Sequence, residues 1–468
     1  MTHLADPPTT GQDARAAELR ASCPGFVNLP GDAAYDDGRA AWNLAARQHP
    51  AAVALPGTVD EISRLVRAAA RLGLRVAAQT TGHSAGTLVA RGLEDVVLVR
   101  MNALSGVYVD SANRTARVEG GARWRDVVAA AAPHGLAALH GSSPHIGVTG
   151  YTLGGGLGFY GRKHGLAASS VVGVELVTAD GEVVRADART HPDLFWAVRG
   201  GGGNFGIVTA LEFRLHPIAD AYAGMLLWDI GAAPDVVRAW AAWSRTAPEE
   251  ITTSLRIMRF PPIPELPDFL RGRSLVIVDG VALLDDAAAA EQLTALRALQ
   301  PEMDTFGRIP VTAVTGIHMD PEHPTAAVGD HTLLTAFDDA AVDAFLAAVG
   351  PGVDTPVFVA EVRQLGGALG RPAEDGGALS HLAGSHAAMF LATAFTPEMA
   401  AAGTAAVGAA RAALAPWSEG RSFLNFTEQP IDAATAYDGD AWARLRRVKT
   451  EVDPGGLFVA NHEVRGER

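Results

Sequence analysis

Glycine-bearing segments in the first third of the chain carry the residue types best suited to bind phosphate. Two loops, at 79–84 and 141–158, each follow apolar, strand-like sequence. Glycine lets the backbone reach positive φ and approach a ligand closely, and the amides of such turns can converge on a phosphate group. Two loops of this kind in one half of a chain, one with His83 at its tip, indicate a large phosphate-bearing cofactor and suggest a covalent tether.

His83 allows two interpretations from local sequence. It is either a turn histidine satisfied by backbone groups or a neutral imidazole that attacks an electrophilic carbon of the cofactor. A metal site is not indicated, because His83, His140 and His145 lack partners at ligand spacing. A hydrolase is not indicated either, since no G-x-S-x-G elbow is present.

Segments 156–161 and 201–206 both match the pattern G-x-G-x-x-G. A nicotinamide-type dinucleotide site requires a strand before this pattern and a helix after it. No clear strand precedes Gly156, and a strand follows Gly206, so a Rossmann site is not expected.

Composition narrows the class of protein. The 468 residues carry a formal net charge of −14 and no basic run, which argues against nucleic-acid binding. The single cysteine, Cys23, excludes internal disulfides and cysteine metal clusters. No apolar run is long enough to span a membrane, and residues 1–20 lack a signal-peptide core. We therefore expect a cytoplasmic protein without membrane or nucleic-acid partners, as a monomer or homodimer.

The order of predicted elements favours an α+β fold over a doubly wound parallel sheet. A capping box at Thr58 and Glu61 opens a helix that Gly73 ends, and strand 75–80 follows. Asp180-Gly181 indicates a hairpin between 171–178 and 182–186. Residues 1–25 are expected to be loosely ordered. Beyond 218, the predicted strands are 225–230, 251–260, 274–280 and 356–363, and the predicted helices are 234–246, 285–299, 338–349, 397–415 and 438–452.

These features together resemble the berberine-bridge-enzyme-like FAD-linked oxidases of the vanillyl-alcohol oxidase, or PCMH-type FAD-binding, superfamily. The similarity covers most of the chain, through 42–50, 75–84, 120–122, 147–158, 193–208, 365–368, 425–426 and 449–461. It implies a two-lobed FAD-binding domain built from both chain ends, residues 1–218 and 416–468. Residues 219–415 would then form an α/β substrate domain whose antiparallel sheet, covered by helices, lies over the isoalloxazine.

The resemblance also assigns site residues. His83 matches the histidine that bonds to the flavin 8α-methyl group. Ser143 occupies the position of a second, cysteine tether, so we expect a single covalent link. Thr81 stands where the family pattern Arg-Ser-Gly-Gly-His has a glycine. The other implied FAD-binding residues are Gln79, Thr80, Gly82, Ser84, Gly147, Thr149, Gly150, Gly154, Gly155, Gly156, Gly158, Asn204, Gly206, Ile207, Val208, Asn425 and Asn461.

Such enzymes move a hydride from substrate to flavin N5 and return the electrons to dioxygen. The resemblance implies a small-molecule alcohol, amine or phenolic or polyketide substrate, as in secondary metabolism. Glu361 and Arg363 share one face of a strand and are either a base and a substrate clamp or a paired edge of the sheet. Tyr160 could present a phenol or pack in the core. Phe423 or Phe426 occupies the usual tyrosine position.

Three alternatives remain open at this point. The chain could oxygenate its substrate, since some relatives with one tether hold oxygen on the flavin. It could be a dehydrogenase that uses another electron acceptor. It could also be a ligand-binding protein on an oxidase scaffold, because the usual tyrosine base is absent.

Overall fold

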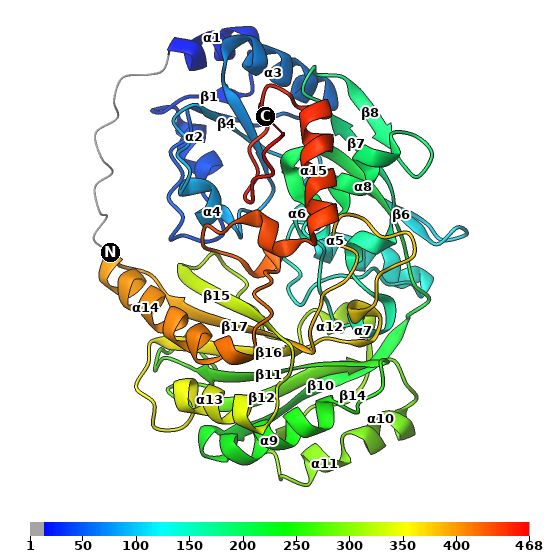
Figure 1. Ribbon diagram of the computed structural model, residues 1–468, viewed down its shortest axis with the longest axis vertical. Helices are drawn as coiled ribbons and strands as arrows, with labels where there is room; N and C mark the ends of the chain where they lie inside the picture. The colour runs from blue at the N-terminus through cyan, green and yellow to red at the C-terminus, as the bar shows by residue number, and fades with distance from the viewer. Residues whose placement is uncertain (1–13, 468) are drawn as a thin grey trace.

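Three β-sheets organise residues 14–467, the part of the chain that the computed structural model describes (Figure 1). The first sheet has the order β1 (Val27–Asn28), β2 (Ala52–Ala54), β4 (Val96–Arg100), β3 (Arg75–Gln79). The second has the order β5 (Val107–Asp110), β6 (Thr115–Glu119), β9 (Ile207–Arg214), β7 (Val171–Val177), β8 (Val183–Ala186). The third has eight strands and forms the opposite half of the molecule.

Local sequence signals explain the elements around the first sheet. Helix α3 (Val59–Leu72) begins at the Thr58 capping box and ends at Gly73. The φ of Gly73 is 67°, in the left-handed region that glycine adopts readily because it has no Cβ. The buried face of α3 carries Ile62 and Leu65 at helical spacing and packs against the sheet. Strand β3 then runs parallel to β4 and delivers the loop at 80–84 to the sheet edge.

The second sheet is antiparallel throughout. Its predicted hairpin between β7 and β8 is confirmed, with Gly181 at φ 79° in the turn. The helices around these two sheets are α1 (Ala14–Ser22), α2 (Ala33–Arg39), α4 (Ala85–Val89), α5 (Trp124–Ala131), α6 (Val148–Leu153), α7 (Gly161–His164) and α8 (Pro192–Gly201).

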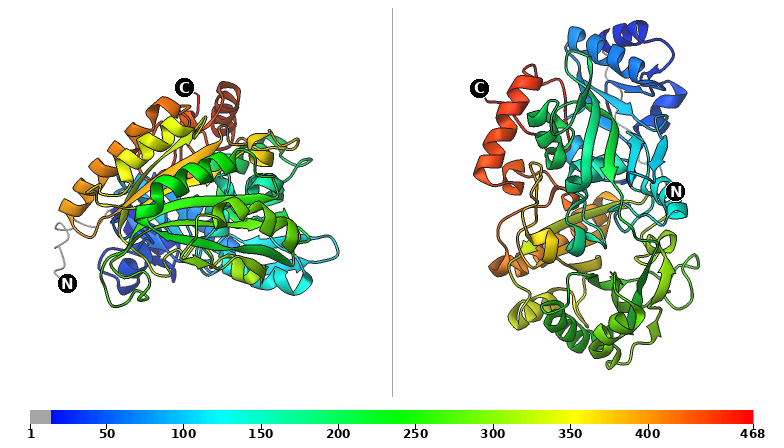
Figure 2. Two further views of the ribbon diagram at one scale, coloured as in Figure 1. Left: turned by 90° about the horizontal axis from the view of Figure 1, so that it is seen from below. Right: turned by 90° about the vertical axis from the view of Figure 1, so that its right-hand side faces the viewer.

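The eight-stranded sheet is also antiparallel. Its order is β13 (Met303–Asp304), β10 (Asp220–Asp229), β12 (Ser274–Ala282), β11 (Ile251–Arg259), β16 (Val357–Gln364), β17 (His386–Thr393), β15 (Ala327–Leu334), with β14 (Gly307–Pro310) also on β10. One face packs on helices α9 (Ala233–Ser244), α13 (Asp339–Val349) and α14 (Pro397–Ala413) through a single apolar core (Figures 1 and 2). The opposite face looks toward the two smaller sheets (Figure 1).

The predicted α+β class with an antiparallel, helix-covered sheet is confirmed. The sequence patterns miss β15 and β17, because Gly329 and Asp330 interrupt the first and alanines dilute the second. The single helix expected at 285–299 is two, α10 (Asp286–Gln292) and α11 (Thr294–Arg297), and the short α12 (Val311–Val314) follows. The looseness expected for 1–25 is wrong from residue 14 onward, where α1 forms; residues 1–13 lie outside the described part.

The C-terminal segment returns to the first sheet. Helix α15 (Gly439–Val452) packs on α8, and the chain beyond it pairs with β3 through a bridge between Val76 and Phe458 (Figure 2). Lys449 Nζ donates to the Asn204 carbonyl at 2.7 Å and to Asp453 Oδ2 at 2.6 Å. Asp453 also accepts from the amides of Leu457 and Phe458, so the buried pair fixes the turn after α15.

The expected domain limits at 218 and 415 stay a prediction. Within residues 14–467, no helix combines the length and apolar character that crossing a bilayer demands.

We predict that Asp453→Asn lowers the free energy of unfolding by about 3 kcal/mol, because it leaves the buried Lys449 ammonium without its counter-charge. Chemical denaturation of the two proteins measures this difference. The control is Asp268→Asn, which breaks a pair with Arg271 in which the Asp268 side chain is 93% exposed and which should change stability by less than about 1 kcal/mol. Equal effects of the two substitutions would contradict the prediction.

Candidate active site

A cavity of about 380 Å³ lies where the glycine loops face the eight-stranded sheet. One wall consists of loops 79–84, 141–154 and 201–208 with the C-terminal residues 459–462. The opposite wall includes Asp320, Arg363 on β16, and Met389 and Leu391 on β17. Residues 424–428 contribute from the segment that crosses between the two halves. The cavity is thus assembled from segments far apart in sequence.

Most of the residues assigned from sequence meet in this cavity. Those that line it are Gln79, Thr80, Thr81, Gly82, His83, Ser84, Ser143, Gly147, Thr149, Gly150, Gly154, Gly206, Val208, Arg363, Asn425 and Asn461.

Other assigned glycines lie behind the wall and serve packing. A Cβ on Gly158 would lie 1.9 Å from the His140 carbonyl oxygen. Gly155 and Gly156 hold φ values of 114° and 78°, and a Cβ on either would meet side-chain atoms closer than 3.0 Å. These glycines therefore permit the turn that shapes the wall, and they do not face the cavity.

Asn204 and Ile207 also lie outside the lining. The Asn204 side chain donates to the His462 carbonyl and accepts from the Val464 amide, both at 2.9 Å. It therefore clamps the C-terminal segment from behind the cavity. Ile207 is buried in the core beneath the first sheet.

His83 is held by two neighbours at the cavity wall. Its Nδ1 lies 2.8 Å from Thr81 Oγ1. The Trp42 ring stacks on the imidazole with centroids 4.7 Å apart and planes 14° apart. Burial lowers the pKa of His83 to about 4, despite the opposing charge of Asp320. The imidazole is therefore neutral at pH 7 and can act as a nucleophile.

The glycine wall fits an extended phosphate-bearing group. Among the described residues, the amides of Gly82, His83 and Ser84 have no hydrogen-bond acceptor. A Cβ built on Gly150 or Gly203 would meet no atom within 4 Å, so both backbones border open space in the cavity. Converging amides can satisfy phosphate oxygens without a cationic side chain. This arrangement fits the FAD that the sequence resemblance implies.

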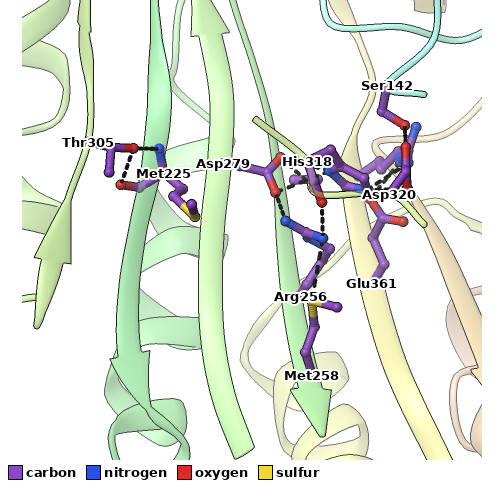
Figure 3. A network of polar contacts seen from close by, with 11 residues as sticks. Ser142, Met225, Arg256, Met258, Asp279, Thr305, His318, Asp320 and Glu361 are labelled. Carbon is purple, nitrogen blue, oxygen red and sulfur yellow. Dashed lines mark hydrogen bonds and ion pairs between the residues drawn. The ribbon is translucent and has the colours of Figure 1, made fainter. Parts of the chain in front are cut away.

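A buried polar network supports the opposite wall (Figure 3). Arg363 Nε donates to Glu361 Oε1 at 2.6 Å, and Arg363 Nη2 donates to His318 Nε2 at 3.2 Å. His318 Nδ1–H then points to Asp279, at 3.1 Å from both carboxylate oxygens. Burial would raise the pKa of Asp279, but the paired Arg256 and its neighbours hold it at about 2. The network therefore keeps Arg363 charged and fixed.

Glu361 does not reach the cavity. Its residue is 1% exposed, and its carboxylate is occupied by Arg363, with His318 Nε2 3.5 Å away. The expected face sharing with Arg363 is confirmed, but of the two only Arg363 lines the cavity. Tyr160 lies behind the wall as well: its ring is 5.2 Å from that of His140, and its hydroxyl has no partner among residues 14–467. Burial raises the Tyr160 pKa further from neutrality.

The sequence patterns did not predict two carboxylates that line the cavity, Asp320 and Glu428. Asp320 accepts from Ser142 Oγ at 2.7 Å and lies 4.0 Å from His318 Nε2 (Figure 3). Burial opposes its charge, but His318, the Ser142 hydrogen bond and Arg363 together hold the Asp320 pKa below its usual value. No motif marks either residue; Asp320 follows a short helix in an irregular segment, and only the fold brings it to the cavity.

Glu428 lies at the other end of the lining. Its Oε2 is 3.3 Å from Asn43 Nδ2, and no cationic group pairs with it among the described residues. Burial raises the pKa of Glu428 to about 7. Glu428 lies two residues beyond the segment 425–426 that carries the resemblance, so no sequence signal assigned it.

Comparisons with known proteins agree with this arrangement. The family FAD_binding_4, an FAD binding domain, matches residues 50–187. The chain is 30% identical to a chitooligosaccharide oxidase of Gibberella zeae over 67% of this chain and 60% of that protein. It is 34% identical to an (R)-6-hydroxynicotine oxidase of Paenarthrobacter nicotinovorans over 44% of this chain and 45% of that protein. The matches thus span about half the length of these curated relatives.

The fold is similar to that of a Physcomitrella patens BBE-like protein. The TM-score is 0.84, with 22% identity, over 97% of this chain and 99% of the other. At this identity the similarity concerns the fold.

We predict that Glu428→Gln stabilises the protein above pH 7 and has little effect below pH 4.5. The carboxyl has a higher pKa in the folded protein than its ordinary 4.5, so its protonation favours folding. That contribution is complete at low pH and is lost as the pH rises through about 7. Because the group borders the cavity, we expect a gain of about 1 kcal/mol at pH 8.

Thermal unfolding from pH 4 to pH 8 measures this effect. The exposed Glu419→Gln variant should track the wild type at every pH. A constant offset between Glu428→Gln and wild type would contradict the assigned cause.

Proposed function

Because this chain belongs to the PCMH-type FAD-binding superfamily and has the fold of the berberine-bridge-enzyme-like flavoproteins, we propose that it is an FAD-dependent oxidase of a small-molecule alcohol or amine. The cavity carries the proposal, since glycine loops with a neutral histidine face a polar sheet wall across it. When bound, FAD would accept a hydride at N5 and pass two electrons to dioxygen, which leaves as hydrogen peroxide.

The glycine wall would hold the cofactor. The amides of 82–84 and the open backbone at Gly150 and Gly203 would receive the pyrophosphate. His83 would form the single covalent link. Ser143 accepts a hydrogen bond from the His145 amide at 3.3 Å, and a serine hydroxyl without a base is a poor nucleophile. No second link is therefore proposed.

The sheet wall would bind and orient the substrate. Arg363 is the sole Lys or Arg among the described lining residues, and Glu361 and His318 fix it from behind. We assign Arg363 as the substrate clamp and Glu361 as its positioning residue, in place of the base role expected for Glu361. Asp320, whose side chain is 26% exposed, is the carboxylate beside it. It would accept the proton released from the substrate hydroxyl or amine.

The polar groups of the sheet wall and the names of similar proteins both support the proposed substrate class. Asp320 as acceptor beside Arg363 as donor suits a substrate hydroxyl or amine, since each of these groups can both donate and accept a hydrogen bond. The printed names of the relatives, an oligosaccharide oxidase and a hydroxynicotine oxidase, support the same two classes. A cytoplasmic location, a monomeric or homodimeric state and a role in secondary metabolism complete the proposal.

Oxygenation of the substrate is a second candidate. Phe426 lines the cavity and Phe423 is buried where the family carries a tyrosine, so no tyrosine phenolate is available at that position to accept a proton. Turnover under isotope-labelled dioxygen separates the two outcomes. Label in the product supports oxygenation, and label in the peroxide alone supports the oxidase.

We predict that purified protein is yellow and that Asp320→Asn slows anaerobic flavin bleaching by substrate about 100-fold, because the substrate proton loses its acceptor. Stopped-flow absorbance in the blue region measures the rate, with bound flavin per chain as a second reading. Glu322→Gln, an exposed change in the same loop, is the control and should match wild type.

Protein that neither contains nor takes up flavin would reject the proposed function. Bleaching of Asp320→Asn at the wild-type rate would reject only the role of Asp320.

A further inference from the structure

Glu428 is a carboxylate of the cavity that lacks a counter-charge within residues 14–467. Its Oε2 lies 3.3 Å from Asn43 Nδ2, and its Oε1 has no hydrogen-bond partner in the same part of the chain. Oε1 is not sealed by protein atoms, so it is open to a ligand. Withdrawing a carboxylate from water favours its neutral form unless a cation pairs with it. The protein thus leaves the place of that cation open to a ligand.

Asn43 holds the Glu428 carboxylate in position without neutralising it. The Asn43 Nδ2 also donates to the Ala327 carbonyl at 2.9 Å. Its Oδ1 accepts from the amides of Ala45 and Ala327 at 3.1 and 3.2 Å. Backbone groups therefore fix the Asn43 amide with or without Glu428. Anchoring of Asn43 does not account for the carboxylate.

The charges of the cavity favour a cation beside Glu428. The side chains of the described lining that are charged at pH 7 are Asp320, Arg363 and Glu428, because burial keeps the lining histidines neutral. Arg363 already donates to Glu361 at 2.6 Å. The proposed FAD would add two negative phosphates to the same space. An anionic group beside Glu428 would therefore be repelled, whereas a cationic group would be attracted.

Glu428 stands apart from Arg363 along the sheet wall. A Cβ built on Gly329 of β15 would lie 3.7 Å from the Glu428 carboxyl carbon. Arg363 belongs to β16, and β17 lies between these two strands (Figure 1). Neighbouring strands are about 4.8 Å apart, so about 10 Å of sheet separates the strand of Arg363 from the strand that Glu428 contacts.

The strand between them presents apolar side chains to the cavity. Met389 and Leu391 on β17 both line it, and they share one face because they are two residues apart. Leu391 pairs in register with Gly329 on β15. Met389 pairs with Glu361 on β16. The wall therefore runs from the polar pair on β16 across an apolar stretch to the carboxylate of Glu428.

We propose that Glu428 binds a cationic nitrogen of the substrate, separated by an apolar segment from the group that reacts. The inference rests on the proposed function, which places the reacting hydroxyl or amine at Asp320 and Arg363. It adds a second recognition point and narrows the substrate to molecules with a basic nitrogen at the far end, such as amino alcohols and diamines. The apolar segment would lie on Met389 and Leu391.

Binding of matched linear probes to the FAD-loaded protein tests the proposal. The probes are 8-amino-1-octanol, octane-1,8-diol and 8-hydroxyoctanoate, which share a hydroxyl and a chain length and differ in the charge of the other end. Calorimetry without oxygen gives the dissociation constants at pH 8, above the pKa of about 7 that burial gives Glu428. We expect the amino alcohol to bind about tenfold more tightly than the diol, because a charge-assisted hydrogen bond contributes about this factor. The hydroxy acid should bind most weakly.

Variants locate the preference for the cation. Glu428→Gln should remove most of the difference between the amino alcohol and the diol. Asp320→Asn should weaken both probes alike and keep their ratio, because Asp320 contacts the hydroxyl end. The exposed Glu419→Gln is the control and should retain the wild-type affinities. A preference that Asp320→Asn removes and Glu428→Gln keeps would place the cation at Asp320 and overturn the proposal.

The remaining outcomes separate this inference from the proposed function. Equal affinity of the wild-type protein for the three probes would overturn the inference alone, and so would a lack of measurable binding of the amino alcohol. Protein that takes up no FAD would reject the proposed function, on which the inference rests. That failure is visible as missing flavin absorbance before any probe is added.

Discussion

The buried charge of Lys449 ties the C-terminal segment to the loop at Asn204. Its ammonium bonds to Asp453 and to the carbonyls of Asn204 and Phe458, in a region with almost no solvent exposure. Burying an ammonium is costly unless it is fully paired, so the surrounding turn has little freedom to rearrange. This turn sets the bridge to β3, and β3 in turn delivers the loop that carries His83.

The two walls of the cavity present different chemical groups to a ligand. The glycine wall presents backbone amides and open space, which suit a ligand that brings its own charge. The sheet wall presents side chains whose charges are already balanced by a buried network around Asp279 and His318 (Figure 3). Fixed, paired charges can orient a small polar molecule without large rearrangement when it binds. The two walls thus offer different chemistry: backbone amides on one side and paired side-chain charges on the other.

Local sequence predicted the elements well where periodicity and caps were strong, as in α3 and the β7–β8 hairpin. It failed at β15, the edge strand, and at its neighbour β17, because glycine and aspartate in the first and alanines in the second weaken the strand pattern. The glycine loops and His83 were recognisable because turn geometry constrains residue type locally. The glycine pattern also marked Gly155, Gly156 and Gly158. Packing behind the wall and contact with a cofactor both require glycine, so the sequence could not tell which of these two causes applies.

The sequence by itself determined the α+β class, the loop that presents a histidine, and the absence of a cysteine at the position of Ser143. The first two follow from residue type and local spacing, and the significance of Ser143 follows from the family resemblance. Only the tertiary structure decided that Asp320 and Glu428 border the cavity and that Glu361 is engaged behind Arg363, away from the cavity. Such relations join segments or atoms whose distances depend on how sheets pack, and the spacing of residues along a chain carries no record of those distances.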